Sequence, residues 1–277
     1  MQTYRLWIST PDQPGLIYQI SKSLLDEGFN IEENHEFVDK ERNLFLMRTE
    51  IVGEGAPEIL QENLNAALPN ASIIDLIPAR KKNIVVLATK EAHCLGDILV
   101  QHDSAELAAQ VRGVISNHAL LGGLVGRFGL PFHHVSHENC SREEHEAQIM
   151  DIIDSLSPDL IVLAKYMRVL TPTFVARYAG KLLNIHHSFL PAFIGANPYK
   201  QAHGRGVKII GATAHVVSDD LDEGPIIAQD VVDVDHSYSW QAMRKAGQHV
   251  EKVVLSKALE LLLDDRVFVY GNKTVVF

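Results

Sequence analysis

The stretch KLLNIHHSFLPAF, residues 181–193, ends an apolar run with one amide and two imidazoles. The apolar residues of this stretch, Leu182, Leu183 and Ile185, predict a strand in the interior of a sheet. Residues two apart on a strand point to the same face, so Asn184 and His186 share one face. They also lie at the carboxyl end of that strand, where open α/β sheets bind their ligands. The pair is therefore a candidate site, the alternative being two hydrogen-bonded polar groups at an ordinary strand end.

The next apolar run repeats this arrangement in GATAHVVSDDLDEGPII, residues 211–227. Thr213 and His215 share a face of the predicted strand, and an acidic loop closed by Gly224 and Pro225 follows it. Acidic loops are usually just solvated. An Asp beside an imidazole, however, is the arrangement that orients or charges a general acid or base.

The chain around these motifs alternates short β-rich runs with helical stretches, which predicts an α/β unit wound around a mostly parallel, Rossmann-like sheet. We assign residues 83–277 to this unit. A late antiparallel strand is expected at 225–234, a long helix at 239–262, and a closing hairpin turned on Gly271 and Asn272. The other expected strands are the runs at 83–89, 110–117, 130–135, 160–165, 181–187 and 208–217. One further helix is expected at 141–155.

A smaller unit, residues 1–80, has the order β-α-β-β-α-β, which fits a ferredoxin-like sandwich. A Pro/Asp/Gly turn precedes its first amphipathic helix, and Gly28 ends that helix. The runs at 30–39 and 44–52 are predicted to pair as a hairpin. The short basic stretch at 78–83 is expected to link the two units.

Composition excludes several classes of protein. The chain has 277 residues and a formal net charge of −10, which argues against a nucleic-acid partner. Cys94 and Cys140 are far apart and form no CxxC pair, so neither a disulfide framework nor a zinc-thiolate site is expected. No HExxH motif is present, and we predict no metal site. We also predict a soluble cytoplasmic protein without a membrane partner, since no apolar run approaches the ~20 residues that span a bilayer.

The two polar motifs, together with LAKYMRVL at 163–170, resemble the formyltransferase family of folate enzymes. Arg168 stands 16 residues before Asn184, and Asp222 stands 38 residues after it. The resemblance covers roughly residues 84–235. It implies a catalytic trio of Asn184, His186 and Asp222, with Thr213 and His215 in support. It also implies a pterin pocket lined by Met167, Arg168, Val169, Leu170, Asp219, Asp220 and Leu221.

The chemistry of formyl transfer suits these residue types. Attack on the formyl carbon bound to N10 of tetrahydrofolate develops negative charge on the formyl oxygen. The N–H groups of Asn184 and His186 can meet that oxyanion, and loss of one such donor typically costs ~10²–10³ in rate. Asp222 can hold the imidazole, deprotonate the nucleophile and return the proton to the leaving nitrogen. No cofactor is expected, because 10-formyltetrahydrofolate is itself the substrate.

The formyl acceptor is indicated by the turn VLATKEAHCLGDIL, residues 86–99. Family members that transfer the formyl group to glycinamide ribonucleotide carry a Gly/Ser-rich phosphate cradle there. Here Glu91 and His93 occupy the turn, with no glycine before Gly96. Transfer to initiator tRNA is opposed by the acidic charge of the chain.

Water is the remaining acceptor, and the whole chain resembles the branch of the family that uses it. We therefore expect hydrolysis of 10-formyltetrahydrofolate to formate and tetrahydrofolate, which would supply formate for purine biosynthesis and balance the one-carbon pool. The loop at 194–206 departs from the family pattern at Ile194 and Asn197. Two alternatives stay open, namely transfer to a small amine and a non-catalytic folate or amino-acid sensor.

The N-terminal unit resembles an ACT domain, a small ligand-sensing module, through DQPGL at 12–16 and GFNI at 28–31. That resemblance implies glycine or methionine as an effector. Unpaired strand edges favour pairing between copies, so we expect a homo-oligomer, either a dimer or a tetramer. The alternative is that the turn merely caps a helix and the unit serves assembly alone. The implied effector-site residues are Asp12, Gly15, Leu16, Asn30 and Ile31.

Overall fold

The computed structural model describes residues 1–192 and 197–277, and it divides into two compact units. One unit is Met1–Arg80 together with Phe277, and the other is Lys81–Val276. The expected departure at Ile194 lies outside the described residues, whereas Asn197 lies within them. Among the helices of the described residues, none is both long and apolar enough to cross a membrane.

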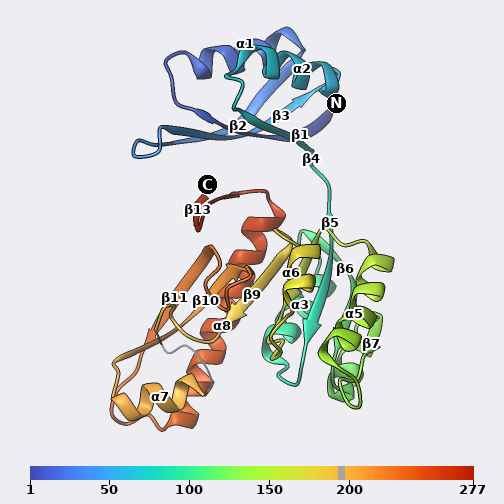
Figure 1. Cartoon of the computed structure of the whole chain (residues 1–277), viewed down its shortest axis with the longest axis vertical. Coiled ribbons are helices and arrows are strands. Elements are labelled where there is room, and N and C mark those ends of the chain that lie inside the picture. The colour runs from blue at the N-terminus through green and yellow to red at the C-terminus, as the bar shows by residue number, and fades with distance from the viewer. Residues whose placement is uncertain (193–196) are drawn as a thin grey trace. The chain divides into compact units, whose positions relative to one another are not determined.

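The N-terminal unit is a four-stranded antiparallel sheet with two helices on one face (Figure 1). The strand order is β2-β3-β1-β4, and the chain order β-α-β-β-α-β is the predicted one. The predicted hairpin is β2 and β3, paired from one end to the other. The elements of this unit are β1 (Gln2–Pro11), α1 (Leu16–Asp26), β2 (Phe29–Asp39), β3 (Leu44–Gly53), α2 (Pro57–Ala67) and β4 (Ile73–Pro78).

Residue spacing explains how α1 packs on this sheet. Leu16, Ile20 and Leu24 recur every four residues, so they form one buried stripe. Gly15 precedes the helix with φ of 92°, and Gly28 follows it with φ of 74°, a backbone conformation that favours glycine. The helix is thus bounded by two residues that let the chain turn sharply at both ends.

The larger unit is built on a seven-stranded sheet of order β11-β10-β9-β8-β5-β6-β7. The five strands from β9 to β7 are parallel, whereas β10 runs antiparallel to β9 and β11 antiparallel to β10. The late antiparallel strand was predicted, but the reversal begins one strand earlier than expected. The strands are β5 (Lys82–Ala88), β6 (Ala109–Ser116), β7 (Phe132–His134), β8 (Leu160–Leu163), β9 (Leu182–His186), β10 (Ile209–Val216) and β11 (Ile226–Asp233), with the hairpin β12 (Val267–Tyr270) and β13 (Lys273–Val276).

Helices cover both faces of this sheet because its central strands are apolar on both sides. Ile84 and Val86 of β5 pack into the core formed with α3 and α8, whereas Val85 and Leu87 pack into the core formed with α5 and α6. Such continuous apolar strands are typical of buried parallel sheets. The helices are α3 (His93–Asp103), η1 (Ala119–Leu121), α4 (Gly122–Gly126), α5 (Arg142–Leu156), α6 (Pro172–Arg177), α7 (Pro198–Arg205) and α8 (Trp240–Leu263).

Candidate active site

The register between β9 and β10 brings the predicted polar residues together. Asn184 lies directly opposite His215, and His186 lies opposite Thr213. Directly opposite residues on paired strands share a face, so all four side chains point to one side of the sheet. The sequence predicted the facing within each strand, and the structure adds the pairing across strands.

His215 fixes the orientation of the Asn184 amide. Its Nδ1 lies 3.0 Å from the carbonyl oxygen of Val216, so Nδ1 carries the hydrogen and donates it. Its Nε2 must therefore accept, and it accepts from Asn184 Nδ2 at 3.1 Å. Burial lowers the pKa of His215 below its ordinary value, which keeps the ring neutral at pH 7. A neutral ring with one fixed tautomer leaves Asn184 with its NH₂ group directed into the cluster.

Asp222 reaches the same cluster from the loop after β10. Its Oδ1 lies 3.2 Å from His186 Nδ1 and 3.8 Å from His215 Nε2. Burial alone would raise the pKa of Asp222, but the hydrogen bond from His186 and the neighbouring imidazoles hold that pKa below its ordinary value. The group is therefore a carboxylate at neutral pH.

The Nε2 atom of His186 is the most telling feature of the cluster. It is buried, and it has no hydrogen-bond partner among the described residues. A buried polar atom without a partner costs about 1–3 kcal/mol, so it is rare unless a ligand or water completes it. The other nitrogen of the ring faces Asp222, which sets the direction in which Nε2 points.

Backbone geometry holds Asp222 in place. Its φ is 58°, a left-handed conformation that Asp tolerates better than most residues. Gly224 then passes so close to β10 that a Cβ there would lie 1.8 Å from the carbonyl oxygen of Val216. The amide of Val216 in turn donates to the carbonyl of Pro225 at 2.9 Å. The Gly-Pro pair thus fastens the acidic loop to the strand that carries His215.

Thr213 shapes the loop after β9 and makes no hydrogen bond within the polar cluster itself. Its hydroxyl donates to the carbonyl of Ser188 at 2.9 Å and accepts from the amide of Leu190 at 3.0 Å. Gln229 Nε2 also donates to it at 2.9 Å. Thr213 therefore supports the polar cluster indirectly, because it holds the Ser188–Leu190 turn directly after His186.

The residues predicted to line a pterin pocket come from two segments. The segment after β8 has Met167 and Val169 exposed, while Leu170 packs on the core formed with α5 and α6. Val217 packs on that same core just before the acidic loop, in which Asp219, Asp220 and Leu221 are exposed. Arg168 is half-buried. The two segments therefore each place one apolar side chain on the same buried cluster.

Two cavities adjoin the polar cluster. The larger, of about 500 Å³, is lined by Asp222 and by the turn of the C-terminal hairpin, including Lys273. The smaller, of about 270 Å³, is lined by Met167 and His187. The His187 ring stacks on His186, with centroids 5.0 Å apart and planes at 22°. Burial, with help from Lys165, lowers the pKa of His187 to about 4, so this ring is neutral.

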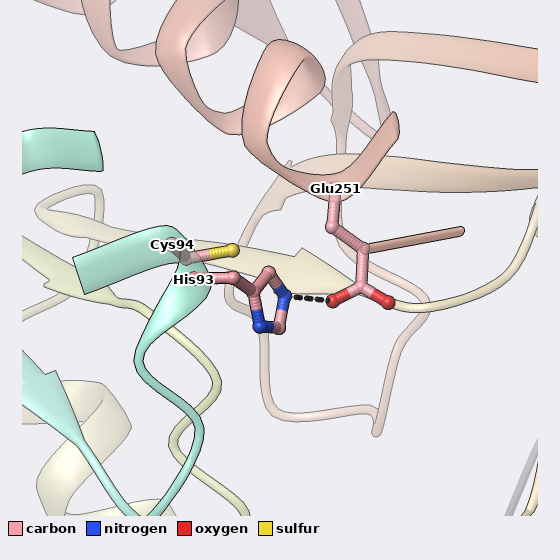
Figure 2. Close-up of side chains that lie close together, drawn as sticks. All are labelled: His93, Cys94 and Glu251. Atoms are coloured by element: carbon pink, nitrogen blue, oxygen red, sulfur yellow. Dashed lines mark hydrogen bonds and ion pairs between the residues drawn. The ribbon is translucent and has the colours of Figure 1, made fainter. Parts of the chain in front are cut away.

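The turn that was predicted to lack a phosphate cradle is occupied by ion pairs to α8. Glu91 accepts from Arg244 at 2.8 Å and from Gln248 at 3.2 Å. His93 Nε2 lies 2.7 Å from Glu251 (Figure 2). Arg244 offsets the negative charge of Glu91. This turn differs from a phosphate-binding cradle because side chains fill it.

His93, Cys94 and Glu251 gather ligand atoms within 4.8 Å of one another, as metal sites do (Figure 2). Their surroundings do not suit a cation. The Lys165 ammonium lies 3.3 Å from the Glu251 oxygen that His93 also contacts, so positive charge is already present. Burial raises the pKa of Cys94, which keeps it a neutral thiol and a poor ligand.

Three residues of this region escaped the sequence analysis, namely Lys165, Tyr199 and Glu251. Glu251 carried a readable signal, because it lies four residues after Gly247 and four before Leu255 on the apolar stripe of a predicted helix. A lone carboxylate on such a stripe requires buried partners. Its partners come from distant parts of the chain, which sequence spacing does not reveal.

The residues predicted to hold an effector lie at two ends of the N-terminal sheet. Gly15 follows Pro11 at one end of β1, whereas Asn30 of β2 lies level with Thr3 at the other end. Eight residues of strand separate the two levels, which is about 26 Å. Asp12, Asn30 and Ile31 are at least partly exposed, but the Leu16 side chain is 3 % exposed and belongs to the core. One copy of the chain therefore does not bring the whole set together.

Comparison with known proteins extends these observations. Residues 82–259, which contain the sheet and the whole polar cluster, match the formyl transferase domain. The formyltetrahydrofolate deformylase of Escherichia coli O6:H1 is 55 % identical over 96 % of this chain and 95 % of its own length. A solved formyltetrahydrofolate deformylase of Pseudomonas syringae is 39 % identical, with a TM-score of 0.95 over 100 % of this chain and 95 % of that one.

A solved glycinamide ribonucleotide transformylase of Symbiobacterium toebii is 29 % identical, with a TM-score of 0.68 over 71 % of this chain and 94 % of that one. The fold and the polar cluster thus define a formyl transferase domain, a framework shared by hydrolytic and group-transferring enzymes. Both units match the deformylases, whereas the transformylase corresponds to part of the chain. The chain belongs to the formyltetrahydrofolate deformylase family.

Proposed function

We propose that this protein hydrolyses 10-formyltetrahydrofolate with Asn184, His186 and Asp222 as its reacting groups. Its family membership gives the reaction, namely hydrolysis of a formamide C–N bond to formate and tetrahydrofolate. The observation that carries the assignment of residues is the buried, unpartnered Nε2 of His186 beside the carboxylate of Asp222. A ligand oxygen at that position completes the hydrogen bonding of the cluster.

In the proposed reaction the formyl oxygen accepts hydrogen bonds from Asn184 Nδ2 and His186 Nε2. His186 Nδ1 faces Asp222, which leaves Nε2 directed at the substrate. As water attacks, negative charge develops on the formyl oxygen, where the two fixed donors stabilise it. Donors held in place by His215 and Asp222 need no reorganisation during the reaction, which is the physical source of the rate gain.

Asp222 completes the proton balance. Its carboxylate accepts the proton that the attacking water loses, and it returns a proton to N10 as the C–N bond breaks. Formic acid and tetrahydrofolate leave, the acid gives up its remaining proton to solvent to become formate, and the carboxylate of Asp222 is restored. The lowered pKa of Asp222 supports this role, since the group is ionised before each turnover. As proposed, the cycle balances with water and folate alone, without a cofactor or a metal ion.

We propose that the pterin binds between the segment 167–170 and the loop at 219–221. Support comes from Leu170 and Val217, which pack on one and the same buried cluster. The Gly224 anchor extends this support, because it ties the loop to β10. On this proposal the enzyme acts in the cytoplasm and supplies formate for purine biosynthesis while balancing the one-carbon pool.

We further propose that the N-terminal unit is an ACT-type module that assembles the chain and binds glycine or methionine. The separation of Gly15 from Asn30 supports an oligomer, since an amino acid touching both residues would need two copies of the chain. The long edge strand β2, with a row of exposed side chains, offers a surface for such pairing. A dimer is the smallest assembly that meets this requirement.

Formate release without any added acceptor tests the proposed reaction. Sustained turnover from 10-formyltetrahydrofolate supports hydrolysis. Turnover that begins only when an amine is added identifies a transferase, and folate binding without turnover in any mixture identifies a sensor. Binding of glycinamide ribonucleotide at micromolar concentration, measured by calorimetry, would restore the transferase alternative.

The effector proposal needs a separate experiment. Glycine and methionine are titrated into the steady-state assay with the full chain and with Asn30→Ala, while light scattering reports the oligomer. A rate change in the full chain that Asn30→Ala weakens supports the module. Coupling of this kind is typically ~1–3 kcal/mol. If neither amino acid changes the rate, the N-terminal unit serves assembly alone.

A further inference from the structure

The cavity of about 270 Å³ lies beside the reacting imidazole. His187 lines it and stacks on His186, and Lys165 lines it from the end of β8. A nucleophile larger than water that approached the formyl carbon from this side would need this space. The side chains that limit the cavity therefore limit the choice of acceptor.

Tyr199 of α7 forms the part of the cavity wall that lies against α8. A Cβ at Gly247 would lie 2.2 Å from the Tyr199 hydroxyl oxygen and 2.4 Å from two of its ring carbons. The ring therefore lies directly on the helix backbone, in a groove that exists because residue 247 has no side chain. A glycine in a helix interior costs about 1 kcal/mol relative to alanine, so α8 gives up stability where the ring enters.

The hydroxyl of Tyr199 is held by a charged partner. It donates to Glu251 Oε1 at 2.5 Å, one helical turn beyond Gly247. Glu251 is 1 % exposed, and its other oxygen contacts His93 at 2.7 Å and Lys165 at 3.3 Å. Burial would raise the pKa of Glu251, but His93 and Lys165 lower it to about 2, so the partner is a carboxylate. Hydrogen bonds to a charged group are about twice as strong as neutral ones.

Lys165 shows that this arrangement is built at a cost. It is buried and has φ of 60°, a left-handed conformation that is uncommon for a residue with a long side chain. In that conformation its ammonium reaches Glu251, which in turn orients Tyr199. The position of the tyrosine ring is therefore determined by groups from α3, from α8 and from the turn after β8 together.

We infer that Tyr199 restricts the formyl acceptor to water by narrowing the cavity beside His187, whose ring centroid lies 6.3 Å from that of Tyr199. This inference rests on the proposed hydrolysis at Asn184, His186 and Asp222. The transformylase of glycinamide ribonucleotide shares the framework, so the framework itself does not exclude an amine acceptor. Exclusion must come from side chains of this chain, and Tyr199 has the volume, the burial and the fixed position to provide it.

Removing the ring opens a second reaction at the same site. The nitrogen of a small primary amine forms the new bond to the formyl carbon, and the bond from that carbon to N10 breaks. The amine loses one proton and N10 gains one, with Asp222 carrying it between them. The products are a formamide and tetrahydrofolate, so the step balances without any further reactant.

Glycinamide is the probe for this reaction. The full-length protein and its variants Tyr199→Ala and Tyr199→Leu are supplied with 10-formyltetrahydrofolate and rising glycinamide, and mass spectrometry measures formylglycinamide and formate. We expect the wild type to yield formate alone and both variants to raise the ratio of formylglycinamide to formate at least ~10-fold. Tyr199→Phe keeps the ring and is expected to behave as the wild type. Tyr178→Ala controls for loss of a buried tyrosine away from the cavity.

Each outcome decides the matter. Equal product ratios in the wild type and in folded, formate-releasing variants overturn the inference. Loss of formate release in variants that melt like the wild type also overturns it, because Tyr199 would then serve hydrolysis itself. If both Tyr199 variants unfold, Gly247→Ala carries the test, since its methyl group displaces the ring without removing it. A wild type that releases no formate refutes the proposed function first, and this inference with it.

Discussion

Gly224→Ala should disable the enzyme by a displacement that can be worked out from the backbone. The added Cβ would lie 1.8 Å from the carbonyl oxygen of Val216 and 3.0 Å from its carbonyl carbon. Real Cβ contacts essentially never fall below 3.0 Å, so the gap must open by at least 1.2 Å, the difference between 3.0 and 1.8. Both partners are backbone, and Val216 is the last residue of a paired strand. The loop must therefore yield.

Asp222 lies two residues before this point and contacts His186 at 3.2 Å. A shift of more than 1 Å breaks that contact, and a 1 Å misplacement of a reacting group can cost about 10²-fold in rate. We expect kcat to fall about 10²-fold, with the melting temperature of the protein within a few degrees of the wild type because the loop is largely exposed.

Formate release under saturating folate measures kcat, and thermal melting monitors the fold. Gly123→Ala is the matched control, because a Cβ there would meet nothing within 4 Å. Retention of more than half the wild-type kcat in Gly224→Ala, with normal kcat in the control, would show that the loop position does not set the activity. A folded variant with wild-type kcat and a raised KM would instead assign the loop to folate binding alone.

Two further substitutions test charge in and near the site. Asp222→Asn keeps a residue that tolerates φ of 58° and removes the base, so turnover should fall about 10²–10⁴-fold. Folate affinity, measured by fluorescence, should stay within a few-fold of the wild-type value. Near-normal turnover would show that Asp222 is not part of the mechanism. Glu251 has a folded pKa of about 2 against an ordinary 4.5, so its stabilisation is complete above pH 4.5 and is lost as pH falls toward 2. That difference corresponds to about 3 kcal/mol, so urea unfolding should show the wild type losing about that much more stability than Glu251→Gln between pH 5 and pH 2; parallel curves would contradict it.

How much of the structure could be predicted from the sequence depended on whether a feature is determined by neighbouring residues or by distant segments. The strand ending in Asn184 and His186, the acidic loop with Asp222, and the hairpin at Gly271 were all predicted because period and turn chemistry are local signals. The antiparallel direction of β10 was not predicted, because a strand and its reverse have the same apolar pattern. Direction depends on how the chain crosses the sheet, and the pattern carries no record of that.

The residues predicted to bind an effector show the same limit of prediction from local sequence. Gly15 and Asn30 each lie in a local motif that was identified correctly as a turn and a strand start. Their separation by the length of β1 follows only from the register of three strands, Asn30 being level with Thr3 through β3. Motif resemblance therefore named the residues without showing that one copy keeps them apart.

The partners of Glu251 could not be predicted from the local sequence, because each of them is unremarkable within its own segment. Tyr199 lies just after the start of α7, Lys165 just after β8 and His93 at the start of α3, and each is a common residue at such a position. They form a unit because His93 and Lys165 follow the carboxyl ends of the parallel strands β5 and β8, and because α8, which carries Glu251, contacts α3 and α7. A buried carboxylate needs several donors at once, so the fold had to bring them from separate segments. The same requirement makes the network rigid, and a rigid wall is what discrimination between water and a bulkier nucleophile demands, since a side chain free to move aside would admit both.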